Sequence, residues 1–129
     1  MTNTPATVEQ LGEEQYLLLT TFRRDGTPVP TPVWAARDGD ALLVWTVGDS
    51  GKAKRIRRDG AVTVAPCNVR GVPKGEPIQA RATLLGPDGG TAARELIKKK
   101  YGLRGRLFVW ASILRRGADA TIGIRITLA

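Results

Sequence analysis

The sequence predicts a mostly-β domain, an antiparallel barrel with one or two helices packed outside it. Six segments are rich in apolar and β-branched residues, and five of them follow one another through hairpin-like or short loops. The last segment alternates strictly between apolar residues at 122, 124, 126 and 128 and the intervening Gly, Arg and Thr. Strands that succeed one another through short loops pair antiparallel, and closing such a sheet into a barrel removes its edges.

The turn and loop residues on either side of each expected strand set its bounds. The six strands cover residues 15–22, 29–36, 41–47, 61–66, 78–85 and 121–128. Asp-Gly pairs at 25–26 and 38–39 predict hairpin turns, because glycine adopts positive φ without strain. The prolines at 28, 30 and 32 share one parity along the second strand, which predicts an edge strand or an irregular strand beside a cleft.

Helical segments are expected between these strands. Residues 1–7 predict a loose arm before one or two helical turns over 8–13, and a short basic helix covers 50–58. A third helix is expected over 91–101, with Ala92, Leu96 and Ile97 on its apolar stripe and Gly102 as its stop. A further helix is expected over 103–115, and a Gly/Pro/Lys loop over 68–76.

Length and composition predict one domain, residues 1–129, of the soluble globular class. Hydrophobic content is 42% and charged content 25%, and no apolar run approaches the roughly 20 residues of a membrane span. The polar N-terminus lacks the apolar core of a signal peptide, so we expect a cytoplasmic protein. The single cysteine, Cys67, predicts a plain buried or loop thiol and no internal disulfide.

The absence of histidine excludes several classes of active site. Histidine-based acid–base pairs, Ser-His-Asp triads and most zinc or non-haem iron sites need that residue. The net charge of +8 favours phosphorylated or carboxylated partners, and nucleic acid is the first such partner to consider. Aromatic content of 5%, without alternating basic and aromatic residues, argues against single-stranded nucleic acid.

The basic helix predicts an anion site at its N-terminus. It follows a strand directly, opens after Asp-Ser-Gly and places Lys52 and Arg55 beside its buried stripe, with Lys54 and Arg58 turned to water. Free N–H groups and the positive end of the helix dipole favour an anion there. The alternative is that Ser50 is only an N-cap and the cations are a solvated face; these residues leave both interpretations open.

A second candidate pairs the TPVW run at 31–34 with the WT pair at 45–46. Flavin-type rings lie against strand backbone, and the three prolines remove N–H donors from one side of this strand, which shapes the edge of a cleft. The alternative is that each tryptophan belongs to an ordinary core.

In this order, these segments resemble the flavin-binding split barrel of the pyridoxamine 5′-phosphate oxidase superfamily. The runs GTPVPTPVWAARDGDALLVWT, DSGKAKRIRRDGAVTVAPC and ELIKKKYG are most similar to its deazaflavin-dependent branch, the coenzyme F420-dependent oxidoreductases. The resemblance extends over about residues 12–128. It implies a six-stranded antiparallel Greek-key split barrel of the FMN-binding type, forming a homodimer with the cofactor between the subunits.

The resemblance also implies a set of cofactor-binding residues. The backbone of residues 31–34 would line the ring, residues 45–46 would lie at the ring and ribityl chain, and a glutamine would contact the ring. The serine and lysine that open the basic helix would hold the phosphate, with an arginine in support. These residues are Thr31, Pro32, Val33, Trp34, Trp45, Thr46, Ser50, Gly51, Lys52, Arg55 and Gln79.

The sequence differs from the oxidases at positions that bear on its expected function. Gly51-Lys52 stands where the oxidases have Arg-Lys, and their substrate-phosphate histidine and arginine have no counterpart, which argues against pyridoxamine phosphate oxidation. We therefore expect hydride transfer between reduced coenzyme F420 and an organic small molecule, without a catalytic side chain, metal, membrane or nucleic-acid partner. The alternatives are an FMN-binding oxidoreductase and a non-catalytic cofactor- or nucleic-acid-binding barrel. The FVW cluster at 108–110 is expected near the dimer interface or the cleft.

Overall fold

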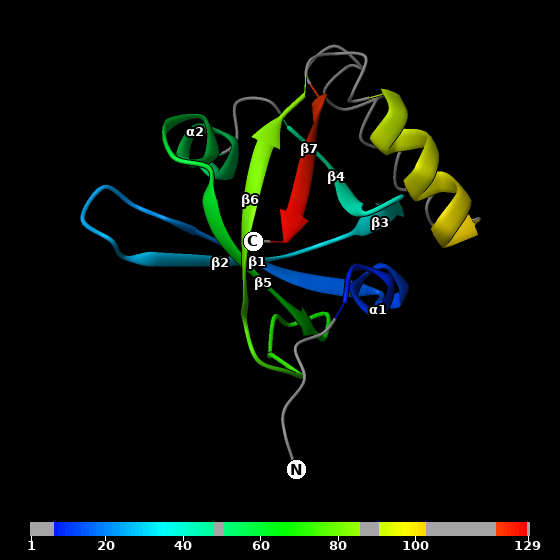
Figure 1. Cartoon of the computed structure of the whole chain (residues 1–129), viewed down its shortest axis with the longest axis horizontal. Helices are drawn as coiled ribbons and strands as arrows, with labels where there is room; N and C mark the ends of the chain where they lie inside the picture. Colours follow the sequence, from blue (N-terminus) through cyan, green and yellow to red (C-terminus); the bar gives the residue numbers. More distant parts are fainter. Residues whose placement is uncertain (1–6, 48–50, 86–90, 103–120, 129) are drawn as a thin grey trace.

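The computed structural model describes residues 7–47, 51–85, 91–102 and 121–128 (Figure 1). Seven strands form one antiparallel sheet in the order β2-β1-β5-β6-β7-β4-β3. The strands are β1 (Tyr16–Phe22), β2 (Pro28–Val33), β3 (Ala35–Asp38), β4 (Ala41–Val47), β5 (Ala61–Cys67), β6 (Ile78–Leu84) and β7 (Thr121–Leu128). The helices are α1 (Val8–Glu13), α2 (Gly51–Arg58) and residues 91–102.

The sheet curls back on itself through a single residue. β2 and β3 occupy opposite edges of the strand order, yet only Trp34 separates them in sequence. Pairing with β1 ends at Val33, opposite Leu17, and pairing with β4 begins at Ala35, opposite Val44. The expected strand 29–36 is therefore one bent strand that serves both edges. This bend accounts for seven strands where six were expected, and the predicted antiparallel split barrel is confirmed.

One face of the curled sheet forms the core of the barrel. On β1, Leu17, Leu19 and Thr21 are buried, and Leu17 and Leu19 lie opposite Val33 and Thr31 of β2. The barrel core gathers residues of this parity from the strands together with one residue from each short helix. Its buried members are Leu11, Leu17, Leu19, Val33, Ala35, Leu42, Val44, Ile56, Val62, Val64, Ala80, Ala82, Ile124 and Ile126.

The prolines of β2 lie where their parity predicts. Pro28, Pro30 and Pro32 are exposed, and β2 is an edge of the strand order. Because proline has no N–H, the ladder with β1 depends on the intervening residues, whose N–H and C=O groups point toward β1. The proline carbonyls then point to the free edge, which offers acceptors and no donors at these three positions.

Helix 91–102 covers the outer face of β3 and β4 (Figure 1). Ala93 and Ile97 are buried in an outer cluster with Ala36, Leu43 and Trp45, and Leu96 packs against it. The prediction of Ala92 on the apolar stripe was wrong, since Ala92 is exposed. Ala93 has the i, i+3, i+4 spacing to Leu96 and Ile97 that one helical face requires. Gly102 ends the helix at φ 62°, as predicted.

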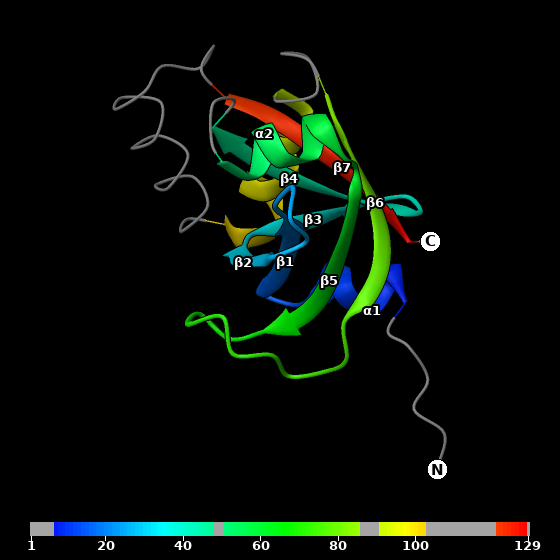
Figure 2. The same cartoon turned by 90° about the vertical axis from the view of Figure 1, so that its left-hand side faces the viewer.

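The two short helices lie at opposite ends of the barrel in both views (Figures 1 and 2). α1 begins with a capping box between Thr7 and Gln10 and buries Leu11 in the barrel core. α2 buries Ala53 and Ile56 and packs on β6 and β1. Both helices have the predicted position.

Two smaller predictions are confirmed. The turn glycines Gly26 and Gly39 have positive φ, 88° and 62°, and the thiol of Cys67 is buried. Ser50, the expected helix 103–115 and the FVW cluster lie outside the described residues. Within the described ranges, no helix is long and apolar enough to cross a membrane.

A close approach at Gly60 positions α2. The carbonyl of Gly60 accepts a hydrogen bond of 2.8 Å from the N–H of Ala82 on β6. A Cβ at residue 60 would lie 2.6 Å from the Ala82 carbonyl oxygen, closer than real contacts allow. The chain that leaves α2 can therefore lie against β6 only with glycine at this position.

We expect Gly60→Ala to lower the free energy of unfolding by about 1–3 kcal/mol, because the backbone must shift to relieve the clash. Urea denaturation measures this loss. Ala61→Ser, at the exposed neighbouring position, should change the stability by less than about 0.5 kcal/mol. Equal stabilities of Gly60→Ala and the parent protein would show that the strand pair tolerates the added methyl group.

Candidate anion and cofactor site

Two cationic side chains of α2 lie side by side at the start of this helix. Arg55 donates a hydrogen bond of 2.6 Å from Nε to Oγ1 of Thr21, a buried residue on the core-facing side of β1. A Cβ on Gly51 would lie 2.9 Å from Nη1 of Arg55, so the guanidinium lies over the first residue of α2. Thr21 thus fixes the direction of Arg55 toward the helix N-terminus.

Lys52 adds a second positive charge at the same turn. It is half-buried, and burial lowers the pKa of Lys52, with the neighbouring Arg55 lowering it further. Among the described residues, no carboxylate lies within 4.0 Å of either side chain. Two like charges held together at a helix N-terminus create a local potential that an anion would relieve.

The remaining cations of α2 face solvent. Lys54 and Arg58 are exposed, as predicted, and Arg58 also donates a hydrogen bond of 2.6 Å to the Phe22 carbonyl. Arg58 therefore ties the end of α2 to the end of β1. Lys54 makes no ion pair with any described residue, which makes it a matched comparison for Lys52.

The predicted ring-binding segment coincides with the bend between β2 and β3. Thr31 and Val33 face the barrel interior, whereas Pro32 is exposed on the other side of β2. The indole of Trp34 stacks on the ring of Tyr101, with centroids 4.2 Å apart and an interplanar angle of 9°. The indole of Trp34 therefore packs against the end of helix 91–102.

The predicted pair on β4 is divided between two faces of the sheet. Trp45 belongs to the outer cluster under helix 91–102. Thr46 is buried on the opposite face, across from Ile122 of β7. Adjacent strand residues point to opposite sides, so one ligand can contact the side chain of only one of them.

Gln79 lies on the outer face of the sheet. It is exposed and stands opposite Thr63, which in turn stands opposite Thr20. The structure therefore brings Gly51, Lys52 and Arg55 together at α2, whereas Gln79 is exposed on β6. A surface hollow of about 420 Å³ beside α1, lined by Thr7, Val8, Glu9, Arg37, Gly39 and Asp40, contains none of the predicted residues.

Comparison with known proteins assigns the family. The family model for pyridoxamine 5′-phosphate oxidase matches residues 4–119. The chain belongs to this family. No curated protein matches the sequence significantly.

Solved structures share the fold of this pyridoxamine 5′-phosphate oxidase family member at low identity. An F420 reductase is 21% identical over 98% of this chain and 96% of its own, with a TM-score of 0.65. A conserved hypothetical protein of Mycobacterium tuberculosis is 18% identical over 98% and 86%, with a TM-score of 0.70. The haem storage protein HutZ of Vibrio cholerae is 12% identical over 91% and 83%, with a TM-score of 0.65. Proteins with different tasks therefore share this barrel.

Sequence reasoning missed two functional candidates in this family member, Lys100 and Tyr101. Both lie in the last turn of helix 91–102 and hydrogen-bond to backbone groups of residues 14, 15 and 35. The run KKKYG at 98–102 marks a basic helix end, but nothing in it indicates contact with residues more than 60 positions away.

Cys67 and the carboxylates are the second set of candidate groups among the described residues. Burial raises the pKa of the Cys67 thiol, which leaves it neutral. In the part of the chain that the structure describes, no three His, Cys, Asp or Glu side chains are grouped to hold a metal ion.

The hydrogen bond between Arg55 and Thr21 yields a test of the anion site. Thr21→Val keeps the shape of the side chain and removes the acceptor, so we expect a loss of about 1.5–3 kcal/mol in the free energy of unfolding, the range for hydrogen bonds to charged groups. Urea denaturation measures it. Thr20→Val, on the opposite face of β1, is the matched control. A similar loss in both variants would mean that Thr21 does not hold Arg55.

Proposed function

We propose that this protein is a homodimeric oxidoreductase that transfers a hydride between reduced coenzyme F420 and an electrophilic organic small molecule. Membership of a family that binds flavins supports the reaction class. The fold shared with an F420 reductase makes the deazaflavin a reasonable choice of cofactor. The observation that carries the proposal is the pair Lys52 and Arg55 at the first turn of α2, without a carboxylate partner among the described residues.

The chemistry of these residues fits an anionic coenzyme. Lys52, Arg55 and the free N–H groups at the start of α2 would bind the phosphate, together with Ser50. Gly51 leaves room for the guanidinium of Arg55 above the helix. The exposed cations Lys54 and Arg57 would attract the acidic tail of F420 from solution.

The bend between β2 and β3 would support the ring. Its backbone, from Thr31 to Trp34, would line the ring, and the carbonyl of Pro32 would be an acceptor at the free edge of β2. When bound, the coenzyme supplies the hydride chemistry. The chain binds and orients it and excludes water, so we assign no catalytic side chain.

A second subunit would complete the site. Lys52 and Gln79 lie on different parts of one chain, and a ring that contacts Gln79 would need a cleft formed with another copy. We therefore propose a twofold homodimer, the commonest closed symmetry. FMN is the alternative cofactor, because its phosphate would fit the same cations.

We expect F420 to bind with micromolar or tighter affinity and FMN to bind more weakly, because only F420 carries a polyanionic tail. The affinity for F420 should fall as salt rises, since exposed charges are screened beyond about 8–10 Å at moderate ionic strength. Equilibrium titrations of the purified protein, followed by cofactor fluorescence, measure both constants. Tight FMN binding without any response to F420 would reverse the order of the two cofactors.

We expect Lys52→Ala to weaken cofactor binding by about 1.5–3 kcal/mol, the range for a hydrogen bond to a charged group. Lys54→Ala, which removes the same charge from the exposed face of the same helix, should cost much less. The same fluorescence titration measures both variants. Equal losses would show that α2 is a diffuse basic surface and not a phosphate site.

A further inference from the structure

The bend between β2 and β3 is held by the last turn of helix 91–102. Tyr101 Oη accepts a hydrogen bond of 3.3 Å from the N–H of Ala35, the first residue after the bend. Lys100 Nζ donates one of 2.6 Å to the carbonyl of the same residue. Ala35 is at the start of an edge strand, where backbone groups that face away from β4 have no ladder partner. The helix provides these partners.

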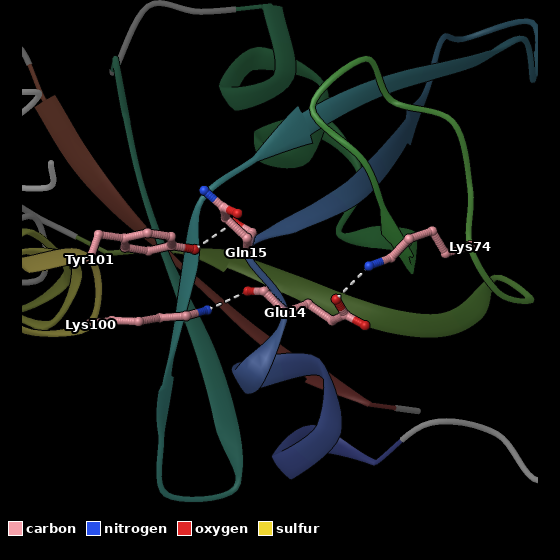
Figure 3. A network of polar contacts seen from close by, with 5 residues as sticks. All are labelled: Glu14, Gln15, Lys74, Lys100 and Tyr101. Atoms are coloured by element: carbon pink, nitrogen blue, oxygen red, sulfur yellow. Dashed lines mark hydrogen bonds and ion pairs between the residues drawn. The ribbon is translucent and has the colours of Figure 1, made fainter.

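The same two side chains also bind the segment that leads into β1 (Figure 3). Lys100 Nζ donates a second hydrogen bond of 2.6 Å to the Glu14 carbonyl, and Tyr101 Oη donates one of 2.8 Å to the Gln15 carbonyl. The tyrosine hydroxyl has one proton, so it donates to Gln15 or to the more distant Ala35 carbonyl at 3.2 Å. Lys100, with three protons, satisfies Ala35 and Glu14 together.

The protonation states of both groups suit this arrangement. Burial raises the pKa of Tyr101 to about 12, against the opposing effect of the Ala35 hydrogen bond, so its hydroxyl remains a donor over the usual pH range. Burial lowers the pKa of Lys100 to about 8, and the negative charge of Glu14 opposes that shift. The Glu14 carboxylate itself points to Lys74, with 3.0 Å between Nζ and Oε2 (Figure 3).

Ring contacts restrict the bend from the same side. Tyr101 stacks on Trp34, the residue at the bend, and Tyr16 lies across Trp34 with centroids 6.5 Å apart. The ammonium of Lys100 lies 4.9 Å from the centre of the Tyr101 ring. The backbone and the side chain of the bend are thus both held by one helix end.

We infer that Lys100 and Tyr101 are positioning residues, which fix the backbone of the β2–β3 bend as the wall against which the cofactor ring lies. The inference rests on the proposed function for its ligand and on the hydrogen bonds above for its geometry. Neither side chain needs to touch the cofactor, because Lys100 acts through Ala35, and Tyr101 acts through Ala35 and Trp34. A wall that shifts by even a fraction of an ångström would misplace the ring.

Two variants and a matched control test this inference. Tyr101→Phe removes the hydroxyl and keeps the stacking on Trp34, and Lys100→Met removes the ammonium and keeps most of the chain length. Lys99→Met is the control, because Lys99 is exposed on the same helix and forms no ion pair with a described residue. Amide hydrogen exchange at Ala35, read by NMR, reports the bend without any ligand. Fluorescence titrations with FMN and with F420 report cofactor binding.

We expect Tyr101→Phe to accelerate exchange at Ala35 by about tenfold and to raise the dissociation constant of the bound coenzyme by a similar factor, as the loss of one hydrogen bond implies. Lys100→Met should raise the dissociation constant likewise, and Lys99→Met should change neither quantity. Lower stability with an unchanged dissociation constant and unchanged absorption spectrum of bound FMN would overturn the inference, since a merely structural role produces that result. A parent protein that binds neither FMN nor F420 would overturn the proposed function first.

The pH dependence gives a second signature of Lys100. The carbonyl carbon resonance of Ala35 should shift with a midpoint near pH 8, where Lys100 loses its proton, in the parent protein and in Lys99→Met. The other titratable groups around it are Glu14, Lys74, Tyr16 and Tyr101, and Tyr101 titrates only near pH 12. The shift should vanish in Lys100→Met. A shift that persists in this variant would overturn the assignment of Lys100.

Discussion

The continuity of β2 and β3 through Trp34 is the constraint on which the rest of the structure depends. One bent strand contributes both edges of the sheet. The two edges are therefore joined by the backbone at Trp34 and not by hydrogen bonds between β2 and β3. The prolines of β2 limit its pairing to β1, and Ala35 begins its pairing to β4. Helix 91–102 stabilises the bend by satisfying the backbone groups that the change of partner leaves without a ladder.

The cations of α2 lie at the edge of the apolar barrel core. The barrel core is apolar, and the half-buried cations Lys52 and Arg55 lie where α2 meets β1. Burial and the neighbouring Arg55 both lower the pKa of Lys52, so both oppose its positive charge. Groups whose pKa is shifted by burial together with a specific neighbouring charge are concentrated at functional sites. This opposition to the charge of Lys52 is the physical argument for an anionic ligand at α2.

The shared fold explains why the family alone leaves the cofactor open. An F420 reductase and a haem storage protein have the same barrel at identities of 21% and 12%. Function therefore belongs to side chains placed on the barrel and not to the barrel itself. In this chain, the groups from which the function is argued are the cations of α2, the carbonyl edge of β2, and Lys100 and Tyr101 at the end of helix 91–102.

The sequence by itself determined the local features of this protein. Strand alternation, the turn glycines, the proline edge and the basic helix follow from side-chain size, backbone freedom and spacing, which act over a few residues. The tertiary structure alone decided that residues 29–36 bend at Trp34, that Ala93 and not Ala92 is buried, and that Trp45 and Thr46 face different sides. It also decided that Lys100 and Tyr101 reach residues 14, 15 and 35. These features depend on which distant segments pack together, and a local sequence pattern does not identify the distant segment that it contacts.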